Sequence, residues 1–283
     1  MKKAVIFGIT LLLLSVGGFV LGQTKLFPFE VTKTGFGKQT IIFIPGLASS
    51  GDVWNETKSK YEKDYTCYSL TMAGFAEVKP QPNATFNSWK IAIANFITEN
   101  KIENPILIGH SLGGGLALAV ASNYPELIGK IIVVDALPCL AAMMNPAFKA
   151  KNNIDCSEIV QQMSSASEEQ FYQMQKLTIS HLVADTSKQK EVLRWSLTSD
   201  RQTVARMYCD FSNTDLREQI NTITCPSLIL LESYFKNMQP SIQEQYRNLQ
   251  TAEIKYADKG LHFIMYDDTE WYLNQIDYFL KVH

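Results

Sequence analysis

Short apolar runs alternate with helix-like stretches in two parts of the chain. Residues 40–44 form an apolar run rich in β-branched and aromatic residues, typical of a strand buried on both faces of a sheet. Further strands are expected over 105–108, 130–134, 227–231 and 252–256, and 65–72 is a weaker candidate. Helical spacing of apolar residues marks 88–97, 112–124 and 269–282. The stretch before residue 40, which contains Pro28, is expected to be a linker. This alternation predicts an α/β fold with a mostly parallel, doubly wound sheet and right-handed crossovers.

The pattern changes between residues 137 and 216, where the chain is polar and helix-like and has no convincing strand. A helical insertion between two strands of one sheet indicates a cap over the strand ends. An independent helical domain is the alternative, and it is disfavoured because both ends of the block return to the same sheet. We therefore expect a core formed by residues 23–136 and 217–283, with a helical cap over 137–216.

The N-terminal segment is typical of a secretory signal peptide. Two lysines, Lys2 and Lys3, precede a largely apolar run from residue 4 to 21, and Gly22 precedes the polar Gln23. The segment predicts a signal peptide over residues 1–22, removed before Gln23, and an exported protein that is not inserted in a membrane after cleavage. An uncleaved membrane anchor is the alternative.

Composition narrows the functional classes. The chain has 283 residues, 46% of them hydrophobic, which suffices for one large core. A formal net charge of −2 without a basic stripe argues against nucleic-acid binding. Neither metal-ligand spacing nor a phosphate-binding loop is present, so no cofactor or metal is expected. The partner we expect is a small acyl substrate, and the oligomeric state is not predicted.

The five cysteines form neither a regular disulfide framework nor a zinc motif, since their number is odd and no C-x-x-C pair occurs. Cys67 and Cys225 lie within or beside strand-like runs and are expected to be buried packing thiols. Cys139, Cys156 and Cys209 lie in the middle region, where one disulfide is possible in an exported protein.

Residues 109–113 read Gly-His-Ser-Leu-Gly, a G-x-S-x-G pattern between an apolar strand and a small-residue helix. A serine hydroxyl is a poor nucleophile unless it is held clear of the backbone beside a base. A strained strand-to-helix turn does this, and it needs glycines two residues before and two residues after the serine. Ser111 is therefore the candidate nucleophile. The alternative is a glycine-rich turn with an incidental serine.

Three motifs together resemble the α/β-hydrolase superfamily. They are the Gly-His-Ser-Leu-Gly turn, Ile-Pro-Gly-Leu-Ala-Ser-Ser-Gly-Asp-Val-Trp at 44–54, and Gly-Leu-His-Phe at 260–263. The resemblance covers about residues 38–136 and 222–282, and it implies a nucleophile, an acid and a base in that chain order. A serine at the turn does not fit epoxide hydrolases and haloalkane dehalogenases, which use an aspartate there.

The candidate base is His262, one of four histidines. His110 adjoins the nucleophile and should point away into the fold, His181 lies in the expected cap, and His283 is the last residue. His262 follows the last strand, which is where the superfamily places its base. A loop histidine without a role is the alternative.

The candidate acid is less sharply defined. The resemblance implies an aspartate after the strand that follows the cap, but that stretch holds only Glu232, at the very end of the strand. A second position known in the superfamily, at the end of the strand after the nucleophile helix, is occupied by Asp135. We therefore favour Asp135 as the acid, with Glu232 as the alternative and Asp258 behind both.

The resemblance also implies an oxyanion hole formed by the backbone N–H groups of Leu47 and Leu112. These residues together predict a serine hydrolase that cleaves a small, fairly apolar ester, lactone or amide through an acyl-enzyme on Ser111. Two alternatives stay open: a C–C bond hydrolase with the same triad, and a non-catalytic ligand-binding or sensor protein on this scaffold.

Overall fold

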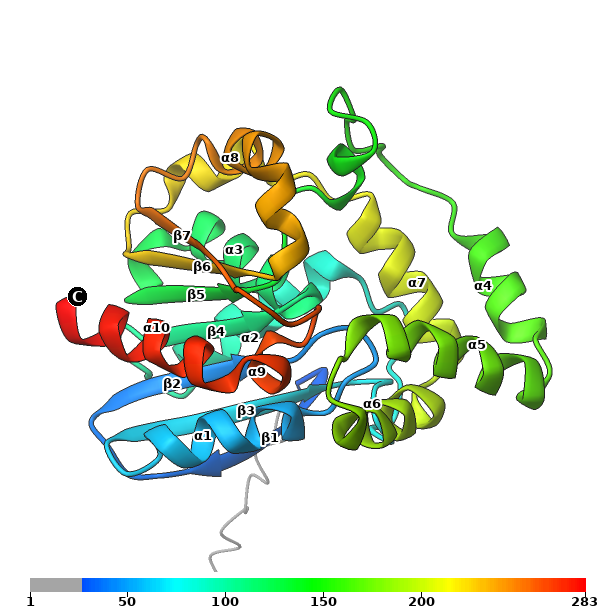
Figure 1. The fold of residues 1–283 in the computed structure, drawn as a ribbon, viewed down its shortest axis with the longest axis horizontal. Helices are drawn as coiled ribbons and strands as arrows, with labels where there is room; N and C mark the ends of the chain where they lie inside the picture. Colours follow the sequence, from blue (N-terminus) through cyan, green and yellow to red (C-terminus); the bar gives the residue numbers. More distant parts are fainter. Residues whose placement is uncertain (1–26) are drawn as a thin grey trace, which may run out of the picture.

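A seven-stranded sheet forms the centre of the molecule in a computed structural model, which describes residues 27–283 (Figure 1). The strand order is β1-β3-β2-β4-β5-β6-β7, and every neighbouring pair is parallel except β1 and β3. The strands are β1 (Phe29–Thr34), β2 (Gln39–Ile44), β3 (Tyr65–Met72), β4 (Ile106–His110), β5 (Lys130–Val134), β6 (Ser227–Leu231) and β7 (Ala252–Tyr256).

Helices cover both faces of this sheet and one end of it. Those near the sheet are α1 (Asn55–Tyr61), α2 (Phe86–Glu99), α3 (Leu112–Asn123), α8 (Gln239–Tyr246), α9 (Ile264–Asp267) and α10 (Thr269–Val282). Those inserted between β5 and β6 are α4 (Ser157–Ser165), α5 (Glu168–Leu182), α6 (Thr186–Thr198) and α7 (Arg201–Ser212). Short 3-10 turns connect several elements, among them η5 (Ser233–Met238).

Successive residues of the central strands enter two different cores, as the period of two in a strand requires. In β2, Ile42 and Ile44 belong to the core shared with α2, α3 and α8, whereas Ile41 and Phe43 belong to the core shared with α1 and α10. All four side chains are fully buried. The sheet is therefore covered on both faces, and the prediction of a mostly parallel, doubly wound α/β fold is confirmed.

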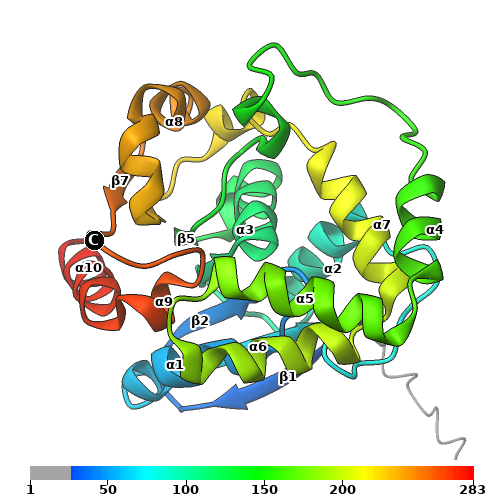
Figure 2. The ribbon, with the colours of Figure 1, turned by 45° about the vertical axis from the view of Figure 1, so that its right-hand side comes forward.

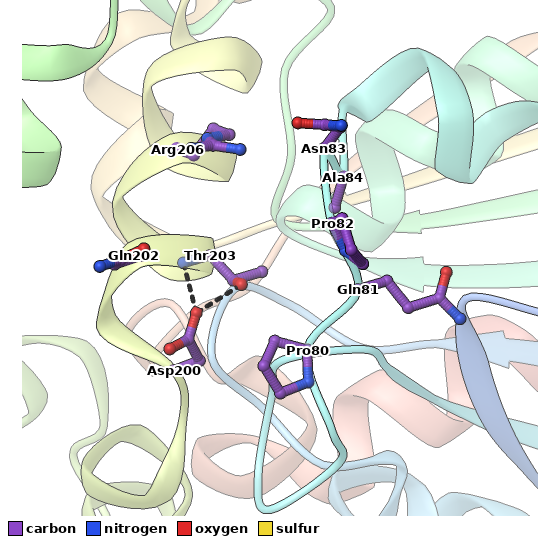
Figure 3. A pocket seen from close by; sticks show the side chains of 9 residues that line it. All are labelled: Pro80, Gln81, Pro82, Asn83, Ala84, Asp200, Gln202, Thr203 and Arg206. Atoms are coloured by element: carbon purple, nitrogen blue, oxygen red, sulfur yellow. Dashed lines mark hydrogen bonds between the residues drawn. The ribbon is translucent and has the colours of Figure 1, made fainter.

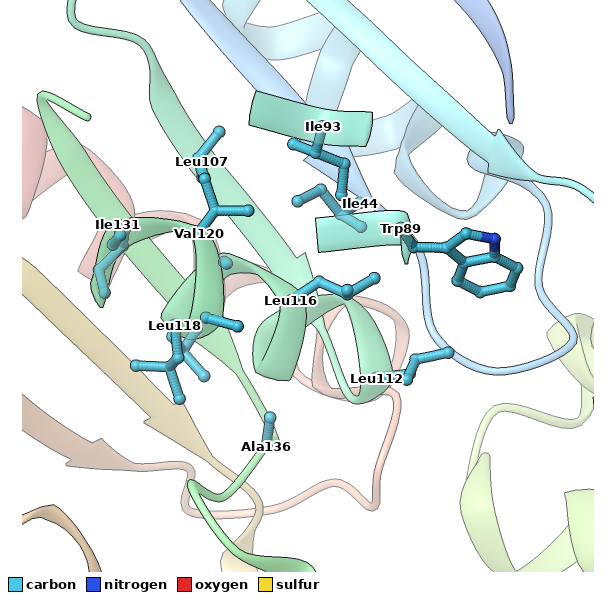
Figure 4. Close-up of a cluster of buried hydrophobic side chains, with 14 of the residues drawn as sticks. Ile44, Trp89, Ile93, Leu107, Leu112, Leu116, Leu118, Val120, Ile131 and Ala136 are labelled. Carbon is cyan, nitrogen blue, oxygen red and sulfur yellow. The ribbon is translucent and has the colours of Figure 1, made fainter. Parts of the chain in front are cut away.

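The helix α3 packs directly on the middle of the sheet (Figure 4). Its Leu116 and Val120 side chains lie near Leu107 of β4 and Trp89 of α2, within one buried cluster. Each fully buried leucine or valine contributes roughly 1.5–3 kcal/mol relative to an exposed one. This packing holds the N-terminal end of α3 at the carboxyl end of β4.

The helices α4 to α7 lie beyond one end of the strands, on the right of Figure 1, and Figure 2 shows α5 and α6 running across that end. A disulfide joins Cys156, just before α4, to Cys209 of α7. Cys67, Cys139 and Cys225 are free and buried. Of the three cysteines in the middle region, the bridge therefore uses two, and it lies among the helices inserted between β5 and β6.

The N-terminal region differs from the expected linker, because Phe29–Thr34 forms the strand β1. This strand lies at the edge of the sheet, and four of its six side chains are exposed, so it lacks the apolar run that marks the central strands. The predicted signal peptide, residues 1–22, and the predicted new N-terminus, Gln23, lie outside the described residues. Among residues 27–283, no helix has both the length and the apolarity to span a membrane.

Candidate active site

Ser111 occupies a sharp turn between β4 and α3. Its backbone has φ 53° and ψ −120°, and its N–H donates a hydrogen bond to the carbonyl of Val134 at 2.9 Å. A Cβ atom on Gly109 would lie 2.1 Å from the carbonyl oxygen of Gly113, and one on Gly113 would lie 2.2 Å from that of Ile44. Both positions therefore require glycine, as the G-x-S-x-G pattern predicts.

Three non-glycine residues with positive φ line the same cavity at the carboxyl edge of the sheet. Besides Ser111, they are Ala48, with φ 54°, and Asp135, with φ 48°. Such conformations cost about 1–3 kcal/mol each and persist where the surrounding structure enforces them. Their concentration at one edge marks it as a functional region.

Asp135 and His262 form a hydrogen-bonded pair beside Ser111. The Oδ2 atom of Asp135 lies 2.6 Å from Nδ1 of His262, and the Asp135 side chain is 1% exposed. An ionised carboxylate only accepts hydrogen bonds, so Nδ1 carries the proton and Nε2 is left as the basic nitrogen. Burial lowers the pKa of His262, but the hydrogen bond and charge of Asp135, with the charge of Glu232, raise it above its usual value overall.

The two other candidate acids occupy different positions. Asp258 pairs with Lys236 at the surface. Glu232 lines the same cavity as Ser111, and its backbone N–H donates to Oδ1 of Asp135 at 2.7 Å. Burial raises the pKa of the Glu232 carboxyl to about 7, and the charge of Asp135 adds to this effect. Asp135, not Glu232, is thus the hydrogen-bonding partner of His262.

His110 is buried, in line with the expectation that it points into the fold, and it contacts the loop that carries His262. Its Nε2 atom is 3.0 Å from the backbone carbonyl of His262, and the two imidazole rings are 4.6 Å apart. Burial, together with the neighbouring His262, holds the pKa of His110 well below its usual value. The neutral ring therefore donates its Nε2–H to this carbonyl and fixes the backbone of His262.

Asp267 is a further residue of the site that the sequence reasoning missed. Its carboxylate accepts hydrogen bonds from the N–H groups of Leu261, Ala184 and Asp185, with distances of 2.9–3.0 Å. It thereby joins the loop that carries His262 to the turn between α5 and α6. The signal in the sequence was weak, because an aspartate five residues after a histidine resembles any helix-terminal acid.

The cavity above Ser111 has a volume of about 650 Å³, which is in the range of small-molecule sites. The carboxyl ends of β2, β4, β5 and β6 form its floor, and α4 to α7 form its roof. The roof is mostly apolar and includes Ile159, Met163, Ile179, Leu182, Val204 and Phe211. Leu47 and Leu112, the predicted oxyanion-hole residues, also line it. As the first residue of α3, Leu112 leaves its N–H without an acceptor inside the helix.

A second hollow, of about 280 Å³, lies between the segment Pro80–Ala84 and the first turn of α7 (Figure 3). Its carboxylate, Asp200, accepts hydrogen bonds from the N–H and hydroxyl of Thr203 at 2.8 and 2.6 Å. Asp200 therefore caps α7. The reactive side chains lie in the larger cavity.

Comparisons with known proteins agree with this geometry. The sequence model of the alpha/beta hydrolase fold family matches residues 39–269. Pimeloyl-acyl-carrier-protein methyl ester esterase of Proteus mirabilis is 25% identical over 209 residues, covering 73% of this chain and 78% of that protein. An uncharacterized protein of Mycobacterium tuberculosis is 27% identical over 97 residues, which span only 28% of its length.

Solved structures share the fold at lower identity. The structure of MenH from Staphylococcus aureus superposes with a TM-score of 0.74 at 18% identity, covering 90% of this chain and 98% of that one. Because the family model spans most of the chain, this protein belongs to the alpha/beta hydrolase fold family.

Proposed function

We propose that this protein is a serine hydrolase that cleaves a small, fairly apolar ester, lactone or amide through an acyl-enzyme on Ser111. One observation carries the proposal: Ser111, on its strained turn, lines the same cavity as His262, whose Nδ1 is bonded to the buried Asp135. The family match and the similarity to an esterase support hydrolysis as the class of reaction.

The reaction begins when the Ser111 hydroxyl oxygen attacks the acyl carbon while Nε2 of His262 takes its proton. Asp135 stabilises the resulting imidazolium and keeps Nε2 directed at the reacting atoms. The N–H groups of Leu47 and Leu112 donate to the developing oxyanion, and losing such a donor typically costs about 3 kcal/mol of transition-state stabilisation.

The intermediate then collapses, and the imidazolium gives its proton to the departing alcohol or amine. A water molecule, deprotonated by His262, attacks the acyl-enzyme and releases the acid. The apolar roof of the cavity suits an acyl chain without a large polar surface.

The test is hydrolysis of a panel of short-chain esters, lactones and amides by the chain without residues 1–22, followed by proton release. We expect turnover that rises with pH as His262 loses its proton and that disappears in Ser111→Ala. A Ser111→Ala variant with full activity would contradict the proposal. The C–C bond hydrolase alternative is examined with diketones in the same panel. The sensor alternative was motivated by the lack of an aspartate after the strand that follows the inserted helices, and the 2.6 Å contact between Asp135 and His262 weighs against it.

We also propose that the protein acts after export from the cytosol. The N-terminal segment is typical of a signal peptide, and the Cys156–Cys209 disulfide supports the same compartment, since such bonds persist mainly in oxidising environments. Expression of the full chain and of a chain lacking residues 1–22, followed by cell fractionation, tests this. Equal cytosolic retention of both would contradict it.

A further inference from the structure

Four side chains of the cavity wall can carry a charge near neutral pH: His110, Asp135, Glu232 and His262. No lysine or arginine occurs among the described residues that line this cavity. Asp135 accepts a hydrogen bond from Nδ1 of His262, and His110 is held neutral by burial. Glu232 is therefore the acidic residue of the described wall whose carboxyl group is held by no hydrogen bond or salt bridge.

The position of Glu232 is fixed although its carboxyl group is not bonded. The residue directly follows β6, and its N–H is held by Asp135 at 2.7 Å, so its side chain starts next to the proposed catalytic pair. Within residues 27–283 the Glu232 carboxyl has neither a hydrogen-bond donor nor a salt-bridge partner. The cation nearest in sequence, Lys236, is paired with Asp258.

Burial, together with the nearby charge of Asp135, destabilises the Glu232 carboxylate and raises its pKa to about 7. A cationic group brought by a ligand removes that penalty, whereas a second anion increases it. Aromatic side chains of the same wall, Phe211 and Phe235, suit a cation attached to an apolar body.

We infer that Glu232 is a specificity-determining residue, whose carboxylate binds a cationic group of the substrate and disfavours anionic substrates. This inference rests on the proposed hydrolase function and narrows its substrate class. The substrate has an apolar body, a scissile acyl bond at Ser111, and a positive charge within reach of Glu232.

Two pairs of esters with matched shape test the inference. Choline butyrate and 3,3-dimethylbutyl butyrate differ in charge on the alcohol side. Methyl 4-(trimethylammonio)butanoate and methyl 5,5-dimethylhexanoate differ on the acyl side. The ratio of kcat/KM for the cationic and neutral ester is measured at about pH 8, where a carboxyl group with this pKa is ionised. The variants are Glu232→Gln and Glu232→Met, with Glu103→Gln, on an exposed loop, as the matched control.

We expect a ratio of about ten or more in at least one pair for the unaltered protein and for Glu103→Gln, falling to about one in both Glu232 variants. Calorimetric binding of the same esters to Ser111→Ala, with and without Glu232→Gln, reads the charge preference independently of turnover. Failure of the proposed function would appear as no Ser111-dependent hydrolysis of any ester while this binding preference persists. A kcat/KM ratio near one in the unaltered protein would overturn the inference. The same conclusion would follow if the Glu232 variants left the ratio unchanged in both ester pairs and left the binding preference unchanged.

Discussion

The carboxyl edge of the sheet and the helices α4 to α7 face each other across one cavity, yet they are built differently. At the sheet edge, Ser111 and Asp135 follow strands that are buried except at Lys130, and the Asp135 side chain is 1% exposed. Among the inserted helices, α4 has no buried residue and α5 has two, whereas α6 has three and α7 has four. Dense packing holds the reactive groups in place, whereas the sparse packing of α4 and α5 permits that part of the roof to adapt to a substrate.

The largest effect should come from substitution of Asp135, at the densely packed carboxyl edge of the sheet. In Asp135→Asn the side chain no longer requires the proton on Nδ1 of His262, so Nε2 is no longer held as the base. We expect kcat/KM to fall about ten-thousandfold with the fold retained. Asp258→Asn, at the surface, is the matched control and should stay within about twofold. A loss of less than about tenfold would show that Asp135 is not the acid.

An intermediate effect should come from removal of the Cys156–Cys209 disulfide, which lies among the helices α4 to α7. The bridge spans 53 residues of the cap, and closing a loop of this size contributes up to about 4 kcal/mol in the chain-entropy account. The double variant Cys156→Ser, Cys209→Ser should therefore lower the free energy of unfolding, with a first transition confined to the cap.

Hydrogen exchange during denaturant unfolding separates the two regions in this variant. Amides of α4 and α7 should lose protection before those of β4 and β5. Simultaneous loss of protection in both regions would mean that the cap and the sheet form one cooperative unit, and the comparison would then fail.

A smaller effect should come from Asp267, which links the two regions. In Asp267→Asn an N–H donor replaces one of the two acceptor oxygens that hold Leu261, Ala184 and Asp185. We expect about a tenfold loss in kcat/KM, because the His262 loop and the α5–α6 turn become less well fixed. Unchanged kinetics in this variant would show that the roof does not position His262.

The sequence predicted the sheet edge better than the cap, for a physical reason. The strands β3, β5, β6 and β7 match their predicted bounds, and β5 and β6 were visible because each is a nearly uninterrupted apolar run. The edge strand β1 was missed because its exposed side chains carry no such signal. The cap was predicted as a helical block, but its separate helices were not, because their apolar positions are few.

The site was predictable where chemistry demands a local pattern. The turn itself requires the glycines around Ser111, so the pattern can be found in the amino-acid sequence alone. The choice between Asp135 and Glu232 depends on which carboxylate reaches His262 across three strand ends, and the structure places Asp135 there. His110 and Asp267 act through backbone groups of distant residues, which no local pattern records.

The most direct test of the central claim is labelling of the protein with a fluorophosphonate probe, read by intact mass. The account predicts one probe per chain, and no labelling in Ser111→Ala or His262→Ala under the same conditions. A folded protein that is not labelled, or a Ser111→Ala variant labelled as fully as the unaltered chain, would contradict an activated serine at this position.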